Sequence, residues 1–123
     1  MKSNYLYFNA NPWGVEEEDC VCRAISAALG IKYTAVNNLL DLISKTHRCD
    51  KLCVCCYHKL LEDIFGMTPI YPDERAVGEI ARDHPGSKII IRIDGHLTCS
   101  MYGVIIDLWD CTRLKADCYW LVE

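Results

Sequence analysis

Three residues that lie far apart in the chain carry side chains that could together perform thiol chemistry. Cys20 follows an acidic run at 16–19, His96 follows a glycine, and Asp107 ends an aliphatic run. A thiolate is a nucleophile, an imidazole can take up the thiol proton, and a carboxylate fixes the tautomer and orientation of the imidazole. Because thiol enzymes can supply these groups in this order along the chain, the pattern predicts a thiol site wherever the fold brings the three together.

A helix is expected to begin at Cys20. Apolar residues follow helical spacing over 20–29, Asp19 is the expected N-cap, and Gly30 is suited to end the helix. A helix N-terminus favours the thiolate over the thiol, so this position suits a nucleophile. Cys22 lies roughly 200° further round the same helix and cannot face the same site, so Cys20 is the preferred nucleophile. The plainer interpretation is that Cys20 is a small core residue.

The histidine and the aspartate are expected on neighbouring strands. Strands predicted at 96–102 and 104–109 are joined by a tight turn and should form an antiparallel hairpin. This places His96 on one strand and Asp107 on the other, where a ring nitrogen and a carboxylate can meet. Taken singly, His96 could be a strand histidine bonded to the backbone and Asp107 a turn cap. Their occurrence together with Cys20, in this order, favours the functional interpretation.

The rest of the pattern predicts an α+β fold in one domain spanning 1–123. Helices come first and an antiparallel sheet comes last, which is typical of this class. No linker, repeat or low-complexity segment divides the chain. The further expected elements are a strand at 4–9, helices at 34–45, 57–65 and 77–82, and strands at 88–93 and 119–122.

Three motifs surround the candidate residues. They are Asp19-Cys20-Val21-Cys22-Arg23-Ala24-Ile25, Gly95-His96-Leu97-Thr98 and Gly103-Val104-Ile105-Ile106-Asp107-Leu108-Trp109-Asp110. Over roughly 9–33 and 88–121 the chain resembles small papain-like cysteine peptidase-fold proteins of phages and bacteria. The resemblance implies N-terminal helices packed on a C-terminal antiparallel sheet, with Cys20, His96 and Asp107 as a Cys–His–Asp set. It also implies a thiol hydrolase acting on a peptide or isopeptide bond of a peptide or protein substrate, without a cofactor.

An oxyanion donor is also needed for acyl transfer. Papain-like enzymes commonly use a Gln or Asn amide shortly before the cysteine, and this chain contains no Gln. The resemblance therefore leaves Asn11, or Asn9, as the candidate side chain, with the backbone N–H of Cys20 as a second donor. Asn11 also precedes a proline, and Asn-Pro is a common turn pair, so a purely structural role is the alternative.

Arg23 and Trp109 lie close to these motifs. Arg23 is expected either to pair with a carboxylate such as Asp110, holding the helix to the sheet, or to be a solvated charge. Trp109 is expected in the core.

Composition excludes several classes of protein. The chain has 123 residues, of which 51% are hydrophobic, and a net charge of -4 with no basic block, so a nucleic-acid partner is not expected. No apolar run is long enough to cross a membrane, and the N-terminus lacks an apolar signal segment. These features favour a cytoplasmic protein. The nine cysteines are then expected to be reduced thiols, because an odd count does not complete a disulfide framework.

Five potential metal ligands crowd a short segment: Cys49, Cys53, Cys55, Cys56 and His58, with His47 nearby. Their spacing is not that of paired Cys-x2-Cys knuckles, so no metal is predicted. The cysteines are expected to be surface thiols whose replacement by serine costs little stability. Two other functions are left open: a zinc-stabilised interaction module built on this segment, and a catalytically silent papain-like fold acting as a phage or host protein-binding factor.

Overall fold

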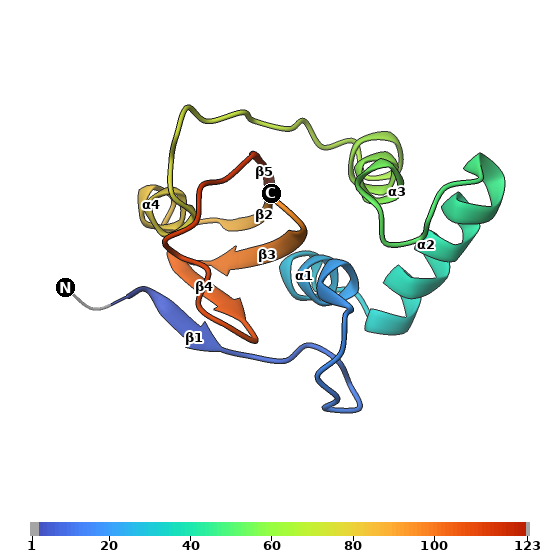
Figure 1. The fold of residues 1–123 in the computed structure, drawn as a ribbon, viewed down its shortest axis with the longest axis horizontal. Helices are drawn as coiled ribbons and strands as arrows, with labels where there is room; N and C mark the ends of the chain where they lie inside the picture. The colour runs from blue at the N-terminus through green and yellow to red at the C-terminus, as the bar shows by residue number, and fades with distance from the viewer. Residues whose placement is uncertain (1–2, 123) are drawn as a thin grey trace.

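The computed structural model describes residues 3–122 and shows one five-stranded sheet with helices packed on it (Figure 1). The strand order is β1-β4-β3-β2-β5. The elements are β1 (Tyr5–Tyr7), α1 (Cys20–Leu29), α2 (Tyr33–His47), α3 (Val54–Lys59), a π-helical turn η1 (Leu60–Ile64), α4 (Val77–Asp83), β2 (Lys88–Ile93), β3 (His96–Met101), β4 (Val104–Asp107) and β5 (Cys118–Val122). The expected α+β class is confirmed.

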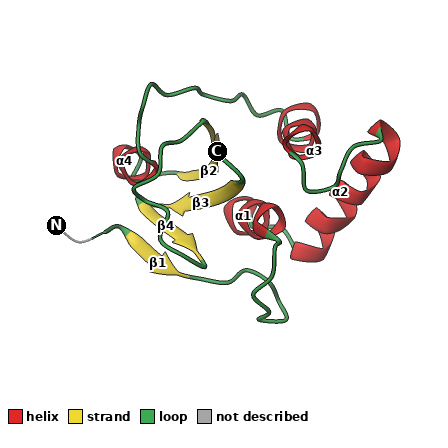
Figure 2. Ribbon diagram, in the orientation of Figure 1, coloured by secondary structure: helices red, strands yellow, loops and turns green. Residues whose placement is uncertain are grey.

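Alternation along β2 explains why helices lie on both faces of the sheet. Ile90 packs with α1, α2 and α3, whereas Ile89 and Ile91 pack with α4. Figure 2 shows α4 on one side of the strands and the other helices on the opposite side. A strand with apolar residues on both faces must be covered twice, which is why this segment is a nearly continuous aliphatic run.

The sheet is mixed, whereas the sequence predicted an antiparallel one. The meander β2–β3–β4 is antiparallel as expected, and β5 pairs antiparallel with the free side of β2. Strand β1 instead runs parallel to β4, with Tyr5 opposite Ile105 and Tyr7 opposite Asp107. This parallel pairing is possible because β1 and β4 are joined by a long connection that contains most of the fold, not by a hairpin.

The two hairpin turns of the meander use backbone conformations that glycine adopts readily. Gly95 has φ 70°, and Tyr102-Gly103 has φ 53° and 89°. Two consecutive positive φ values match the twist of antiparallel strands, so the second turn aligns β3 with β4. This alignment matters because β3 begins at His96 and β4 ends at Asp107.

A second layer of helices lies outside α1. Helix α2 packs on α1, and α3 with η1 packs on α2 (Figure 1). The expected helix at 57–65 in fact begins at Val54, and its last turn is π-helical, with Phe65 N–H donating to the carbonyl of Leu60 at 3.1 Å. Within residues 3–122, no helix combines the length and hydropathy needed to cross a bilayer.

Candidate functional site

Cys20 is the first residue of α1, and Asp19 before it occupies the N-cap position, as expected. The Asp19 side chain makes no capping hydrogen bond, however. Its carboxylate instead accepts hydrogen bonds from Arg23 Nε at 2.6 Å, Tyr33 Oη at 2.6 Å and Asn11 Nδ2 at 3.0 Å. Throughout the described part of the chain, the backbone N–H of Cys20 donates to no protein acceptor. The Cys20 N–H is therefore a free hydrogen-bond donor at the helix N-terminus, next to the thiol of the same residue.

His96 and Asp107 meet as the hairpin predicts. His96 Nε2 lies 2.6 Å from Asp107 Oδ2, and the two residues are on adjacent antiparallel strands. The other carboxylate oxygen accepts the backbone N–H of Leu108 at 2.7 Å. With Nε2 held by the carboxylate, the opposite nitrogen of the ring is left for the thiol, which is the arrangement a base needs.

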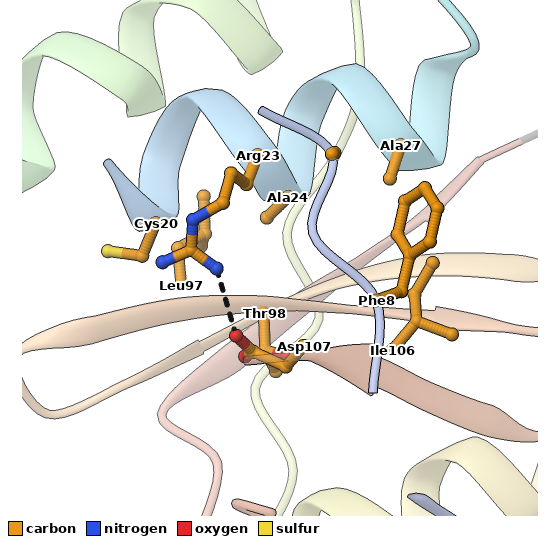
Figure 3. Close-up of a pocket in the computed structure, with 10 residues that line it drawn as sticks. Phe8, Cys20, Arg23, Ala24, Ala27, Leu97, Thr98, Ile106 and Asp107 are labelled. Carbon is orange, nitrogen blue, oxygen red and sulfur yellow. Dashed lines mark hydrogen bonds and ion pairs between the residues drawn. The ribbon is translucent and has the colours of Figure 1, made fainter. Parts of the chain in front are cut away.

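Arg23 connects the helix to the sheet, and its partner is Asp107, not Asp110. Its Nη1 donates to Asp107 Oδ1 at 3.1 Å (Figure 3). Its Nε donates to Asp19. Asp110 instead accepts hydrogen bonds from Thr112 in the following turn. The guanidinium therefore lies between two buried carboxylates and fixes the start of α1 relative to the end of β4.

The electrostatic environment favours a charged pair of Cys20 and His96. Burial raises the pKa of Cys20, but hydrogen bonds from His96 and from the backbone N–H of Leu97 outweigh it, so the pKa lies below its usual value. Burial lowers the pKa of His96, and its bond to Asp107 reverses this and holds the pKa well above the usual range. Cys22 is buried without such partners, and its pKa is raised to about 11. The pKa is thus lowered at Cys20 and raised at Cys22, so only Cys20 is expected to be an effective nucleophile near neutral pH.

Asp107 is held in its ionised form. Burial favours the neutral acid, yet the hydrogen bond with His96 outweighs this and lowers the pKa of Asp107 below its ordinary value. The ion pair with Arg23 places a permanent positive charge on the opposite side of the same carboxylate. An ionised carboxylate at this position stabilises an imidazolium, and an imidazolium stabilises a thiolate.

Trp109 covers the imidazole from the solvent side. Its ring centroid lies 4.8 Å from that of His96, with an interplanar angle of 45°, and 44% of the residue is exposed. The expectation that Trp109 belongs to the core is therefore wrong. Strand β4 ends at Asp107, two residues earlier than predicted, so Trp109 lies in a turn over the site.

Cys111 is a site neighbour that the sequence did not indicate. Its thiol lies 3.9 Å from Asp107 Oδ2, and ligand-type atoms of His96, Asp107 and Cys111 lie within 4.8 Å of one another. These are zinc-binding side chains. However, the His96 and Asp107 atoms are bonded directly at 2.6 Å, whereas nitrogen and oxygen ligands of a tetrahedral zinc lie roughly 3.3 Å apart. The arrangement fits a hydrogen-bonded cluster better than a metal centre.

Asn11 does not offer an amide hydrogen to the thiol in this conformation. Its Nδ2 donates to Glu17 at 3.2 Å and to Asp19 at 3.0 Å, so both hydrogens are committed to carboxylates. Asn9, the other candidate, donates to the carbonyl of Val15 at 3.0 Å. Asn11 is instead a buried support for Asp19, the residue next to Cys20.

The cavity behind the thiol is small. It has a volume of about 10 Å³, room for roughly one water, and lies between α1 and the sheet. In Figure 3 the Cys20 sulfur lies at one end and the Phe8 and Ala27 side chains at the other. A substrate carbonyl must therefore reach Cys20 from the solvent side and not from within this cavity. The residues lining the cavity are Phe8, Ala10, Cys20, Arg23, Ala24, Ala27, Leu97, Thr98, Ile106 and Asp107.

The cysteine-rich segment lies elsewhere, around α3. His58 does not turn toward the thiols: its Nδ1 contacts Glu62 at 2.6 Å and its Nε2 lies 2.8 Å from Arg92. Cys56 is fully buried in the core, so the expectation that all four cysteines are surface residues is wrong. The amphipathic packing of α3 against α2 explains the difference, because the first turn of α3 must place one side chain inward.

Comparison with protein-family models, with curated proteins and with solved structures finds no match to this chain. The residues themselves define the class of site. It is a candidate thiol site: a cysteine begins a helix, an imidazole outweighs burial and lowers the pKa of that thiol, and a buried, ionised carboxylate holds the imidazole. Such a set can form a nucleophilic thiolate and can shuttle a proton.

Proposed function

We propose that this protein is a thiol hydrolase, similar in arrangement to papain-like cysteine peptidases, that cleaves a peptide or isopeptide bond. The observation that carries the proposal is the bond of His96 Nε2 to the Asp107 carboxylate at 2.6 Å, with Cys20 at the start of α1 close enough for His96 to outweigh burial and lower the pKa of its thiol. A helix that bears the thiol and packs on β3, the strand that bears the base, also supports the papain-like comparison.

The chemistry follows from the two charged groups. The Cys20 thiolate attacks the carbonyl carbon, and the backbone N–H of Cys20 is placed to stabilise the oxyanion. His96 gives its proton to the departing amine as the C–N bond breaks, which leaves a thioester on Cys20. A water then loses a proton to His96 and attacks the thioester, which releases the acid and restores the pair of Cys20 thiolate and His96 imidazolium. Asp107 keeps the imidazole oriented during both steps.

Exposed aromatic residues near the candidate site suit a substrate with apolar groups. Trp109 covers His96, and Phe8, which is 46% exposed, lines the end of the cavity away from the Cys20 sulfur. Both rings favour a substrate with apolar side chains, since stacking and burial stabilise such a complex.

Alkylation kinetics at each thiol test the proposal directly. Reduced protein is treated with limiting iodoacetamide between pH 5 and 8, and the cysteines are mapped by mass spectrometry. Cys20 should react fastest at pH 6, and His96→Ala should remove that advantage, because only a paired thiolate persists below neutral pH. Cys55→Ala, which changes an exposed thiol outside the site, is the matched control. Labelling that is uniform, or led by Cys22, would contradict the assignment.

Turnover is tested separately with peptide and isopeptide libraries and with a peptide aldehyde that captures a reactive thiol. Cleavage that disappears in Cys20→Ala supports a hydrolase. One observation favours a second candidate, a silent binding protein with the same fold: Asn11 is committed to carboxylates, so a side-chain oxyanion donor is missing from the described conformation. A Cys20 that alkylates rapidly but never forms a thioester with any library member would favour that candidate.

A further inference from the structure

Two cysteines outside the site approach each other closely. The Sγ atoms of Cys49 and Cys56 are 3.0 Å apart. Cys49 follows the C-terminal end of α2, where its N–H donates to the carbonyl of Ser44 at 3.2 Å and its own carbonyl accepts the Ser44 hydroxyl at 2.5 Å. Cys56 lies in the first turn of α3 and is fully buried. Because the backbone fixes both ends, the approach of the sulfurs is a property of the fold.

The arrangement of the neighbouring ligands argues against a metal at this place. Sulfur ligands of a tetrahedral zinc lie roughly 3.7 Å apart, and at least one further ligand is needed. Among residues 3–122, no third histidine, cysteine or carboxylate comes within 4.8 Å of both of these sulfurs. His58, the imidazole of the segment, is occupied by Glu62 and Arg92. Cys55 also approaches Cys49, but no third ligand is shared by Cys49 and Cys56, so these residues do not form a four-ligand cage.

We propose that Cys49 and Cys56 form a reversible disulfide by exchange with a low-molecular-weight disulfide such as oxidised glutathione. The thiolate of Cys49 attacks one sulfur of the external disulfide, whose S–S bond breaks and releases one small thiol. Cys56 then loses its proton to solvent, and its sulfur attacks the sulfur of Cys49, which releases the second small thiol. Two protein thiols are oxidised, and one external disulfide is reduced to two thiols.

The order of the two steps follows from exposure. Cys49 is partly exposed and can meet an external disulfide, whereas Cys56 is fully buried. Burial, reinforced by the contact with Cys49, raises the pKa of Cys56 to about 12, so Cys56 is a poor first nucleophile. In the second step, proximity compensates for the high pKa of Cys56, because the Cys49 sulfur of the mixed disulfide already lies beside the Cys56 sulfur.

The test equilibrates reduced protein in buffers with graded ratios of oxidised to reduced glutathione, blocks free thiols by alkylation, and maps disulfides by mass spectrometry. It is done in a Cys20→Ala background, so the proposed nucleophile takes no part and the outcome does not depend on the proposed function. The expected product is a Cys49–Cys56 cross-link that reducing buffer reverses. Its melting temperature should be higher than that of the reduced protein, since the cross-link restricts the unfolded chain.

Variants separate the steps. Cys56→Ser should accumulate glutathione on Cys49, and Cys49→Ser should leave Cys56 unmodified. Cys55→Ser removes the exposed thiol that also approaches Cys49, and this variant should oxidise like the parent because Cys56 is the proposed partner. Circular dichroism checks that Cys56→Ser folds, and the partly exposed Cys49→Ser gives an independent readout if it does not. The proposal is overturned if Cys53 or Cys55 forms the dominant disulfide, if no intramolecular disulfide appears in the most oxidising buffer, or if protein purified in reductant holds zinc that Cys49→Ser releases.

Discussion

Helices α1 and α4 both pack on the sheet, and at the start of each an arginine is paired with a carboxylate four residues away. At α1, Arg23 and Asp19 are 2.6 Å apart, and only 8% of each side chain is exposed. At α4, Arg75 lies 3.6 Å from Glu79 and also contacts Asp83, with side chains that are 40–54% exposed. The two pairs have the same chemistry and spacing but opposite burial.

The comparison shows where the fold carries an energetic cost. Burying charges requires that every one be paired, and such groups are retained where their charge is used. At α1 the arginine continues to Asp107 and thus to the imidazole, whereas at α4 the inward side chains are apolar, among them Val77, Ile80 and Ala81. Helix α4 therefore contributes to stability through buried apolar side chains, whereas part of the buried face of α1 is taken up by charged groups of the candidate site.

The largest effect is expected from removing the base. In His96→Gln the thiol of Cys20 loses the imidazolium that stabilises its charge, so its alkylation rate at pH 6 should fall by about 100-fold or more. Stopped-flow alkylation measures this, with His84→Gln as the control because His84 bonds to the backbone of α4 and lies outside the site. An unchanged rate in His96→Gln would mean that α1 and α4 do not differ in function.

Breaking the buried arginine pair should cost the most stability. Arg23→Met leaves Asp19 and Asp107 as neighbouring buried carboxylates without their shared cation, and should lower the free energy of unfolding by about 3–5 kcal/mol. Urea titration measures the loss. Arg23→Lys keeps the charge but not the two-sided geometry and should lie between the parent and Arg23→Met.

The pH dependence of stability should differ between the parent and Asp107→Asn. The lowered pKa of Asp107 contributes stability that is present above about pH 4 and is lost as pH falls through the folded pKa. The raised pKa of His96 contributes stability that is complete below about pH 6.5 and is lost as pH rises toward the folded pKa. The parent should thus be most stable between these limits, and Asp107→Asn should flatten the profile in thermal melts over that range. If Asp107→Asn instead lowered the melting temperature by the same amount at every pH, the result would contradict a charged pair of His96 and Asp107.

The smallest effect is expected at α4. Arg75→Met removes the exposed pairs with Glu79 and Asp83, which are screened by solvent, so the urea midpoint should stay within experimental error of the parent. High salt should change the urea midpoint of neither the parent nor Arg75→Met appreciably. A loss as large as that of Arg23→Met would show that burial is not what distinguishes the two helices.

The sequence predicted the bounds of helices and strands correctly where the residue types and spacing within the segment determine them. The segment 88–93 is a strand with the predicted bounds, and the helix from Cys20 to Leu29 ends at Gly30, whose φ is 67°. His96 and Asp107 were predictable as neighbours because a short turn fixes the register of a hairpin.

What could not be predicted depends on residues far apart in the chain. Arg23 and Asp107 are 84 positions apart, and nothing local distinguishes Asp107 from Asp110 as the partner. Cys111 reaches the site only because the chain turns after β4, and Trp109 is exposed for the same reason. Asp19 lies at the predicted N-cap position, but its side chain does not cap the helix, because three other side chains donate hydrogen bonds to its carboxylate.

The parallel pairing of β1 with β4 has a consequence for how the protein is made. Strand β1 is synthesised before its partner β4, and most of the described chain lies between the paired residues Tyr5 and Ile105, so β1 stays unpaired while that intervening chain emerges. Phe8, just after β1, donates its N–H to the carbonyl of Asp107 at 3.0 Å and lines the cavity beside Cys20. A nascent chain therefore carries Cys20 as an ordinary thiol, and the thiol gains its activating neighbours only when the end of the sheet closes.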